Sequence, residues 1–261
     1  MKPVSLIISG VGGRMGQLVE ALAIKEPGIG PVSGIDTRLV TTSTIQVKPG
    51  EPLPAQATAG IDVLLIFNND PDSVVVQAES AAKTKTAVVV ATTGLGETRL
   101  ASLRVLSGSV PVLVSNNFSL GVNVMNAVLA KMAKALPPYF QIEIVEAHHG
   151  RKLDAPSGTA RMLAQTVCQS REWNPELAIS VGRQAGRSES PRLDEQVVIH
   201  SLRAGSIAGD HAVLFAGPSE TLCLEHHAQS PQVFAEGALA TVKWIAGKPA
   251  GWYTMDQMLG L

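Results

Sequence analysis

The densest chemistry in the sequence lies in one segment, EAHHGRKLDAPSGTA, which spans residues 146–160. It contains two adjacent histidines, His148 and His149, and a lysine, Lys152, that follows three residues later. Histidine titrates near neutral pH and often donates protons in catalysis, whereas lysine carries a compact positive charge. The segment therefore predicts a proton donor beside a cationic patch that binds anions.

The same segment continues through Ser157, Gly158 and Thr159, which follow a proline and precede a predicted helix over 160–168. The N–H groups at a helix start, the helix dipole and two hydroxyls can form a seat for a carboxylate or a phosphate. Ser157 or Thr159 could instead be simple N-caps, and one of the two histidines could be structural. Their combination within twelve residues favours a site for a small substrate with at least one carboxylate.

We do not expect a metal site in this segment. Adjacent residues of a strand point to opposite faces, so the two histidines cannot easily bind one ion. The two cysteines, Cys168 and Cys223, lie far away in the sequence and have no CxxC spacing. We expect both to be buried, free thiols of a protein in a reducing compartment.

A second motif, GVGGRMG at residues 10–16, separates a predicted strand from a predicted helix. Glycines allow a tight turn and let backbone N–H groups approach a pyrophosphate. Asp36 lies 20 residues after Gly16, at the end of the next predicted strand, where a carboxylate can bind a ribose. The motif therefore predicts dinucleotide binding rather than a purely structural turn. NADH is slightly favoured because Asp36 would repel a 2′-phosphate, but Arg38 could offset that charge, so NADPH remains open.

Several elements must position these residues. In the first part of the chain, apolar runs alternate with helical patterns, which implies βαβ units and a parallel sheet. After residue 117 the strands alternate in polarity, as is typical of a mixed sheet. We therefore predict an α/β fold, with a Rossmann-type parallel-sheet domain followed by an α+β substrate and oligomerisation domain. The predicted strands are 4–9, 32–36, 61–67, 86–91, 110–114, 140–147, 197–202, 212–216 and 221–226, the predicted helices are 15–24, 71–83, 100–106, 120–136, 160–168 and 233–245, and residues 37–60 and 182–192 are expected to be irregular.

Composition excludes several classes of protein. Of the 261 residues, 45% are hydrophobic and 16% are charged, which excludes a disordered chain. The net charge of −1 argues against a dedicated nucleic-acid binder. No apolar run reaches the ~18 residues of a membrane helix, and the chain shows no signal peptide. We expect a soluble, cytoplasmic protein.

The segment HHGRKLDAPSGT resembles the signature of the 4-hydroxy-tetrahydrodipicolinate reductase family of bacterial lysine biosynthesis, also called dihydrodipicolinate reductases. Other segments resemble further blocks of that family in the same order, so the resemblance covers essentially the whole chain. These segments are GVGGRMGQ at the start, ATTGL at 91–95, NNFSLGVNVM at 116–125, LRAGSIAGDH at 202–211 and WYTMDQML near the end.

The resemblance implies hydride transfer from NADH or NADPH to a small, cyclic dicarboxylate imine, with a proton delivered to the product. It implies a dinucleotide-binding domain of residues 1–118 and 229–261, and a substrate-binding domain of residues 119–228. It also implies a homotetramer, formed through the sheet of the second domain.

The resemblance also assigns roles to individual residues. His148 would be the proton donor, and Lys152 would hold the substrate and assist protonation. His149 and the turn Ser157-Gly158-Thr159 would bind substrate carboxylates. The residues implied to contact the cofactor are Gly10, Gly13, Arg14, Met15 and Gly16 at the pyrophosphate, Asp36 at the ribose, Phe67, and Thr92, Thr93, Gly94, Asn117 and Phe118 near the nicotinamide.

One departure from the family pattern keeps other functions open. Where the family often has a threonine and a basic residue before a proline, this chain has Asn68-Asn69-Asp70 before Pro71. The chain could be a related imine reductase or an amino-acid dehydrogenase. It could also be a dinucleotide-binding sensor without turnover, although a sensor has no need of a proton donor such as His148.

Overall fold

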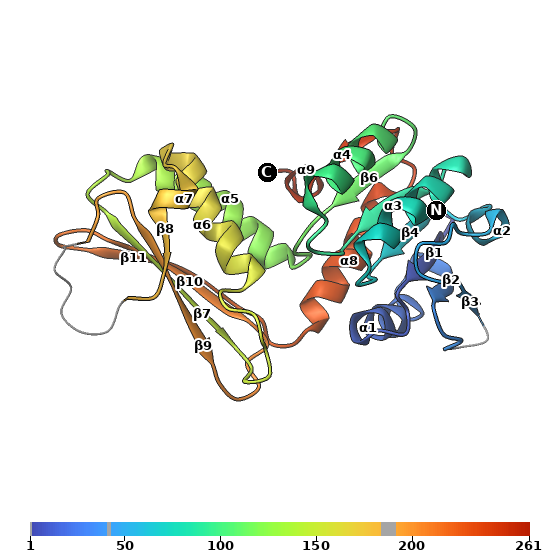
Figure 1. The fold of residues 1–261 in the computed structure, drawn as a ribbon, viewed down its shortest axis with the longest axis horizontal. Helices are drawn as coiled ribbons and strands as arrows, with labels where there is room; N and C mark the ends of the chain where they lie inside the picture. The colour runs from blue at the N-terminus through green and yellow to red at the C-terminus, as the bar shows by residue number, and fades with distance from the viewer. Residues whose placement is uncertain (1, 41–42, 184–191) are drawn as a thin grey trace. The chain divides into compact units, whose positions relative to one another are not determined.

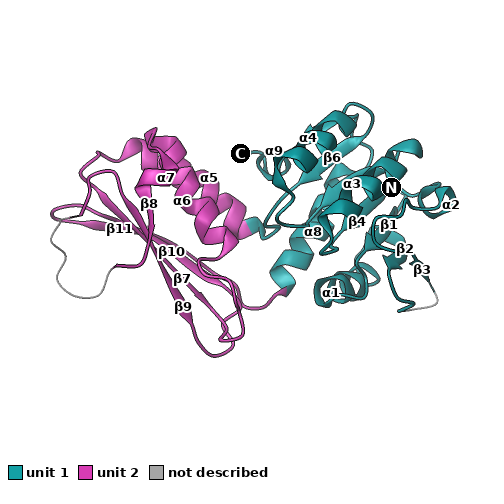
Figure 2. Cartoon of the chain, viewed as in Figure 1, with its two compact units in different colours: residues 1–120, 232–261 teal, residues 121–231 magenta. Residues whose placement is uncertain are grey.

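The structure, a computed structural model, describes residues 2–40, 43–183 and 192–261. The chain divides into two compact units (Figure 2). Unit 1 comprises residues 1–120 and 232–261, and unit 2 comprises residues 121–231. Residues 184–191, which hold most of the loop predicted over 182–192, lie outside the described residues.

Unit 1 is built on a seven-stranded sheet with the order β12-β6-β5-β4-β1-β2-β3. Figure 1 labels β6, β4, β1, β2 and β3 of this sheet. All neighbouring strands in it are parallel. The order β3-β2-β1-β4-β5-β6 is that of the doubly wound dinucleotide-binding fold, which binds ligands outside the carboxyl ends of the strands where the order reverses, here between β1 and β4. The strands are β1 (Val4–Ser9), β2 (Ile29–Asp36), β3 (Thr44–Gln46), β4 (Val63–Ile66), β5 (Ala87–Val90), β6 (Pro111–Val114) and β12 (Gly251–Tyr253).

Helices cover both faces of this sheet, so its central strands are apolar throughout. Within β1, Leu6 and Ile8 pack into the core formed with α1 and α8, whereas Ile7 packs into the core formed with α3 and α4. The sequence starts α3 sharply, because Pro71 occupies its first turn and Asp70 caps it. The helices of unit 1 are α1 (Arg14–Ala23), α2 (Ala55–Thr58), α3 (Pro71–Lys83), α4 (Gly96–Leu106), α8 (Gln232–Ile245) and α9 (Met255–Leu259).

Unit 2 contains a mixed, five-stranded sheet with the order β11-β10-β7-β9-β8. Helices α5 and α6 lie along one side of it, and the other side carries none of the helices described in unit 2 (Figure 2). The strands are β7 (Gln141–His148), β8 (Ile179–Val181), β9 (Val197–Arg203), β10 (Asp210–Ala216) and β11 (Thr221–His227); the helices are α5 (Leu120–Ala135), α6 (Gly158–Arg171) and α7 (Pro175–Ala178).

The predicted fold class is confirmed, and the structure corrects several details. Residues 37–60, expected to be irregular, contain β3 and α2, and the sequence pattern also misses β8 and β12. These strands have only three residues each, too few to show a period. Cys168 is buried as expected, but Cys223 is exposed because it lies on β11, the edge strand. No helix in the described ranges has both the length and the apolar character needed to cross a membrane.

Gly237 of α8 gives a test of the packing in unit 1. A Cβ at this position would lie 1.7 Å from the carbonyl oxygen of Phe118. Replacing a glycine inside a helix by alanine normally stabilises the folded protein by about 1 kcal/mol. Here the steric clash should exceed that gain, so Gly237→Ala should destabilise the folded protein by about 1–3 kcal/mol. Chemical denaturation measures the change. Gly150→Ala, where no atom lies within 4 Å of the added Cβ, is the control. Equal or higher stability of Gly237→Ala would contradict the packing.

Candidate active site

The glycine-rich turn after β1 leaves no room for a side chain at Gly10 or at Gly16. Gly10 has a positive φ of +84°, and a Cβ there would lie 2.9 Å from the backbone nitrogen of Asn68. A Cβ on Gly16 would lie 2.1 Å from the carbonyl oxygen of Gly10. The first turn of α1 therefore packs directly against the end of β1, and the backbone is left as the lining of the turn. This is the cradle that a pyrophosphate requires.

Asp36, at the end of β2, holds this turn in place. Its Oδ2 accepts a hydrogen bond of 2.8 Å from the N–H of Gly12, and its Oδ1 accepts one of 3.2 Å from the N–H of Arg38. The side chain of Asp36 is 10% exposed and that of Arg38 is 73% exposed, with 3.7 Å between Oδ1 and Nε. A carboxylate and a guanidinium thus stand together at the position expected for a ribose.

Two clefts in unit 1 contain most of the predicted cofactor residues. One of about 380 Å³ lies over the carboxyl ends of β1 and β2. The other, of about 320 Å³, lies over the glycine-rich turn and the ends of β4 and β5. Gly94 lines neither of these two clefts. The predicted residues that line the first are Gly10, Gly13, Asp36 and Phe67, and those that line the second are Gly13, Arg14, Met15, Gly16, Phe67, Thr92, Thr93, Asn117 and Phe118.

Asn68, part of the departure from the family pattern, has a structural role between these clefts. Its Nδ2 donates to Oγ of Ser9 at 3.3 Å and to Oε1 of Gln77 at 3.1 Å. Its carbonyl oxygen accepts a 2.7 Å hydrogen bond from the hydroxyl of Thr92. The asparagine therefore ties together the ends of β1, β4 and β5, which are the elements that line the clefts.

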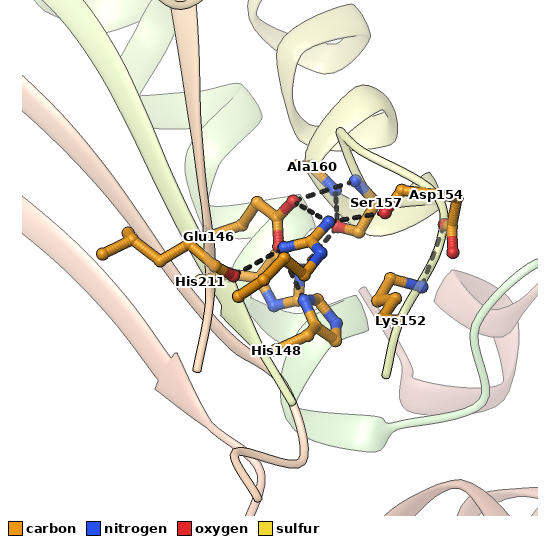
Figure 3. Close-up of polar contacts among 9 residues, drawn as sticks. Glu146, His148, Lys152, Asp154, Ser157, Ala160 and His211 are labelled. Carbon is orange, nitrogen blue, oxygen red and sulfur yellow. Dashed lines mark hydrogen bonds and ion pairs between the residues drawn. The ribbon is translucent and has the colours of Figure 1, made fainter. Parts of the chain in front are cut away.

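In unit 2, one face of β7 carries apolar core residues in its first half and polar residues in its second half. Ile142 and Ile144 are buried in the core, and the same face then carries Glu146 and His148 (Figure 3). The strand register places His211 of β10 opposite Glu146, and Arg203 of β9 opposite His148. Three strands thus bring a carboxylate, a guanidinium and two imidazoles to one place.

Glu146 is the centre of this cluster. Its side chain is fully buried, and four hydrogen bonds surround its two oxygens. Arg203 donates to Oε2 at 2.9 Å and to Oε1 at 2.7 Å, and the N–H of Ser157 donates to Oε1 at 3.2 Å. His148 Nδ1 lies 2.6 Å from Oε2. Burial alone would raise the pKa of Glu146, but these hydrogen bonds, that of Arg203 foremost, lower it to about 2.

His148 lies at the edge of the cluster with its Nε2 directed away from Glu146. Burial lowers the pKa of His148, and the charges of Lys152 and Arg203 act in the same direction, while Glu146 opposes them. Gly209 passes close to the ring, so that a Cβ there would lie 3.1 Å from Nε2. Glycine at this position therefore leaves space beside the nitrogen that could deliver a proton.

The remaining predicted substrate residues surround this histidine. Lys152 Nζ lies 2.9 Å from Oδ2 of Asp154, and this contact lowers the pKa of the Asp154 carboxyl. Ser157 is the N-cap of α6, since its Oγ accepts from the N–H of Ala160 at 3.2 Å. Ser157 can cap α6 and still belong to an anion-binding site, because Gly158 and Thr159 form the first turn of the same helix.

His211 is a further member of the cluster that the sequence pattern did not select. Its Nε2 lies 3.1 Å from Oγ of Ser157, and its ring makes an edge contact with His148 at 5.3 Å between centroids. Burial, followed by the charge of His148, lowers the pKa of His211 to about 4, so it is neutral at pH 7. Glu146 and Arg203 were also missed. The two-residue strand period could have placed Glu146 with His148, but Arg203 and His211 join them only through strand register.

A metal site is not seen in this cluster: the described residues contain no group of three or more His, Cys, Asp or Glu side chains placed to hold an ion. The chemistry available is that of proton transfer and anion binding.

Comparisons with known proteins agree with this geometry. Residues 4–118 match the family model of the dihydrodipicolinate reductase N-terminus, and residues 121–259 match that of its C-terminus. The chain belongs to the dihydrodipicolinate reductase family. It is therefore an oxidoreductase, and the resemblance inferred from its motifs is confirmed.

Individual relatives extend over the whole chain. The 4-hydroxy-tetrahydrodipicolinate reductase of Caldanaerobacter subterraneus subsp. tengcongensis is 37% identical over 256 residues, which are 98% of each chain. That of Clostridium perfringens is 37% identical over 260 residues, which are 99% of each. The fold resembles that of a dipicolinate-bound dihydrodipicolinate reductase from Paenisporosarcina sp. TG-14, with a TM-score of 0.76, 22% identity and 97% of both chains covered.

Proposed function

We propose that this chain reduces the cyclic imine 4-hydroxy-tetrahydrodipicolinate (dihydrodipicolinate) to tetrahydrodipicolinate with NADH or NADPH, in the diaminopimelate pathway to lysine. The observation that carries the proposal is the cluster of His148, Lys152 and the N-terminus of α6, in a chain that matches the reductase family over its whole length. Proton donation and anion binding are what reduction of a dicarboxylate imine requires.

His148 is the proton donor in this proposal. Reduction of a conjugated imine builds negative charge on the ring nitrogen, and an adjacent acid stabilises and quenches that charge. Burial lowers the pKa of His148, which favours the neutral imidazole when no ligand is bound. A bound dicarboxylate brings two negative charges next to the imidazole, which favours the protonated form at the moment when it is needed.

The substrate carboxylates have several positive or polar partners. Lys152 can exchange its contact with Asp154 for one carboxylate, and the first turn of α6 offers N–H groups and the helix dipole to another. His149 adds a polar atom, since its buried Nδ1 has no hydrogen-bond partner among the described residues. Such atoms are usually hydrogen-bonded in native proteins, and a substrate carboxylate would satisfy this one once the imidazole turned towards it.

The cofactor fits the two clefts of unit 1. The cradle of Gly10 and Gly16 excludes side chains where a pyrophosphate would lie, and Asp36 lies where a ribose would be recognised. The nicotinamide would be held among Phe67, Thr92 and the residues that line the second cleft with them. When bound, the cofactor supplies the hydride; the residues of the chain orient it and exclude water.

His148→Gln should lower kcat by roughly 10²-fold or more while KM changes modestly. The variant loses the proton donor but keeps the groups proposed to bind the substrate carboxylates, Lys152 and the start of α6. Lys152→Ala should both lower kcat and raise KM. The assay follows NADH or NADPH oxidation with the pathway imine generated in situ. Lys134→Gln, on the exposed surface of α5, is the control and should resemble the unmodified chain. If purified His148→Gln kept near-normal kcat, His148 would not be the donor.

The same assay separates the alternatives for the reaction. Turnover with the pathway imine supports the proposal. Turnover only with other imines or amino acids would indicate a related reductase or dehydrogenase, and binding without turnover would indicate a sensor.

We propose a slight preference for NADH over NADPH. The carboxylate of Asp36 would repel a 2′-phosphate, but both its oxygens already accept backbone hydrogen bonds. The cleft is also lined by the cations Arg38 and Lys48, which would attract that phosphate. The preference should therefore be small.

Asp36→Ser should raise the ratio of kcat/KM for NADPH to that for NADH by about 10-fold, which corresponds to ~1.4 kcal/mol. Arg38→Ala should move the ratio in the opposite direction, because it removes the cation. Initial rates with each cofactor measure both ratios. Unchanged ratios in both variants would show that these two side chains do not discriminate at the 2′ position.

We further propose a homotetramer assembled through the uncovered side of the unit 2 sheet. That side presents the small and apolar residues Val145, Ala147, Ala212 and Leu214, and a second copy would bury them. Val145→Glu should reduce the mass seen by light scattering below that of four chains. Lys131→Glu, on the exposed surface of α5, should leave the mass unchanged. A monomeric unmodified chain would refute this assembly.

The proposed location is the cytoplasm. Cys168 and Cys223 are both free thiols, which suits a reducing compartment.

A further inference from the structure

The four hydrogen bonds on Glu146 determine which nitrogen of His148 carries a proton. An ionised carboxylate only accepts hydrogen bonds, so the atom 2.6 Å from Oε2 must be a donor. Neutral His148 is therefore the Nδ1–H tautomer, and its Nε2 carries a lone pair. When the ring gains a proton, the new proton is on Nε2, beside Gly209.

We infer that Glu146 is a positioning residue, which holds His148 in this tautomer and favours its protonated form, and that Arg203 in turn holds Glu146. The inference rests on the proposed role of His148 as proton donor. Arg203 binds both oxygens of Glu146, so the carboxylate can neither rotate nor leave the ring of His148.

The charges around His148 show why the carboxylate is needed. Lys152, on the loop after β7, and Arg203, on β9, are cations that lower the pKa of His148. His211, on β10, is neutral because its own pKa is lowered to about 4. Asp154 is paired with Lys152, and its backbone oxygen accepts a hydrogen bond from Arg203. Glu146 is therefore the negative charge in direct contact with the imidazole, and without it two cations would disfavour protonation.

Glu146 also connects the acid to the anion seat. Its Oε1 accepts from the N–H of Ser157, the N-cap of α6, while its Oε2 faces His148. Because one carboxylate makes both contacts, the proton donor and the start of the helix are held at a fixed separation. A substrate that places a carboxylate at the helix then presents its ring to the same histidine.

The test is the pH dependence of kcat/KM for Glu146→Gln. Activity of the unmodified chain should fall as pH rises through the pKa of His148, because the acid is then lost. Removing the negative charge lowers that pKa, so this fall should begin roughly one pH unit lower in the variant. At neutral pH, kcat should drop roughly 10-fold or more. Glu146→Asp, which keeps the charge, should retain the original pH midpoint with a reduced kcat.

Glu143→Gln is a matched control. Glu143 is on the same strand but on the opposite face, where it also contacts a histidine, His200, and the arginines Arg183 and Arg192. This variant should leave the pH midpoint of kcat/KM unchanged. An unshifted midpoint in Glu146→Gln, or an equal shift in Glu143→Gln, would overturn the inference.

A second measurement does not require an active or stable variant. The nitrogen chemical shifts of histidine-labelled, unmodified protein report the tautomer of each of its six histidines, and His148 is assigned by comparison with His148→Gln. The Nδ1–H tautomer is expected for His148, and the Nε2–H tautomer would overturn the inference. If His148→Gln retained its kcat while the tautomer were as expected, the proton-donor role would fail. The contact by which Glu146 sets the tautomer of His148 would then stand, but it would have no part in catalysis.

Discussion

The buried ion pair between Glu146 and Arg203 is the interaction on which the site in unit 2 depends. A buried carboxylate is costly unless it is paired and fully hydrogen-bonded, and here four donors from three places in the sequence meet it. The pair joins β7 to β9 and, through the N–H of Ser157, to the start of α6. Loss of Arg203 would leave the buried charge of Glu146 without its ion-pair partner, and breaking a buried pair in this way typically costs about 3–5 kcal/mol. Stability and chemistry are therefore coupled in the same side chains.

In unit 1, the proposed binding surface for the cofactor is formed mainly by backbone atoms rather than by charged side chains. Its parallel strands end together at the edge where their order reverses, and close packing at Gly10 and Gly16 leaves main-chain atoms to line the turn. Asp36 holds that turn from the neighbouring strand, and Asn68 links the next two strands to it. The proposed dinucleotide site thus depends on the order of the strands, whereas the proposed anion site in unit 2 depends on groups that the end of β7 and the start of α6 bring together.

The sequence predicted those features that depend on local patterns. Apolar runs predicted the parallel sheet, and glycine spacing predicted the turn at 10–16. The residue types within one short segment, 146–160, predicted that His148, Lys152 and Ser157 act together. Features that depend on pairing between distant strands were not accessible. Arg203 and His211 reach the site through the register of β9 and β10 with β7, and the exposure of Cys223 follows from the edge position of β11. Three-residue strands such as β3 are stabilised by their neighbours and leave no periodic signal.

The central claim is that the proton donor and the anion seat form one site, connected by Glu146. The most direct measurement is an NMR titration of His148 with and without dipicolinate, a planar dicarboxylate that resembles the proposed substrate. Binding at the start of α6 and at Lys152 would place negative charge beside the imidazole, so the account predicts that dipicolinate raises the pKa of His148. Saturable binding of dipicolinate with no change in the titration of His148 would contradict the account.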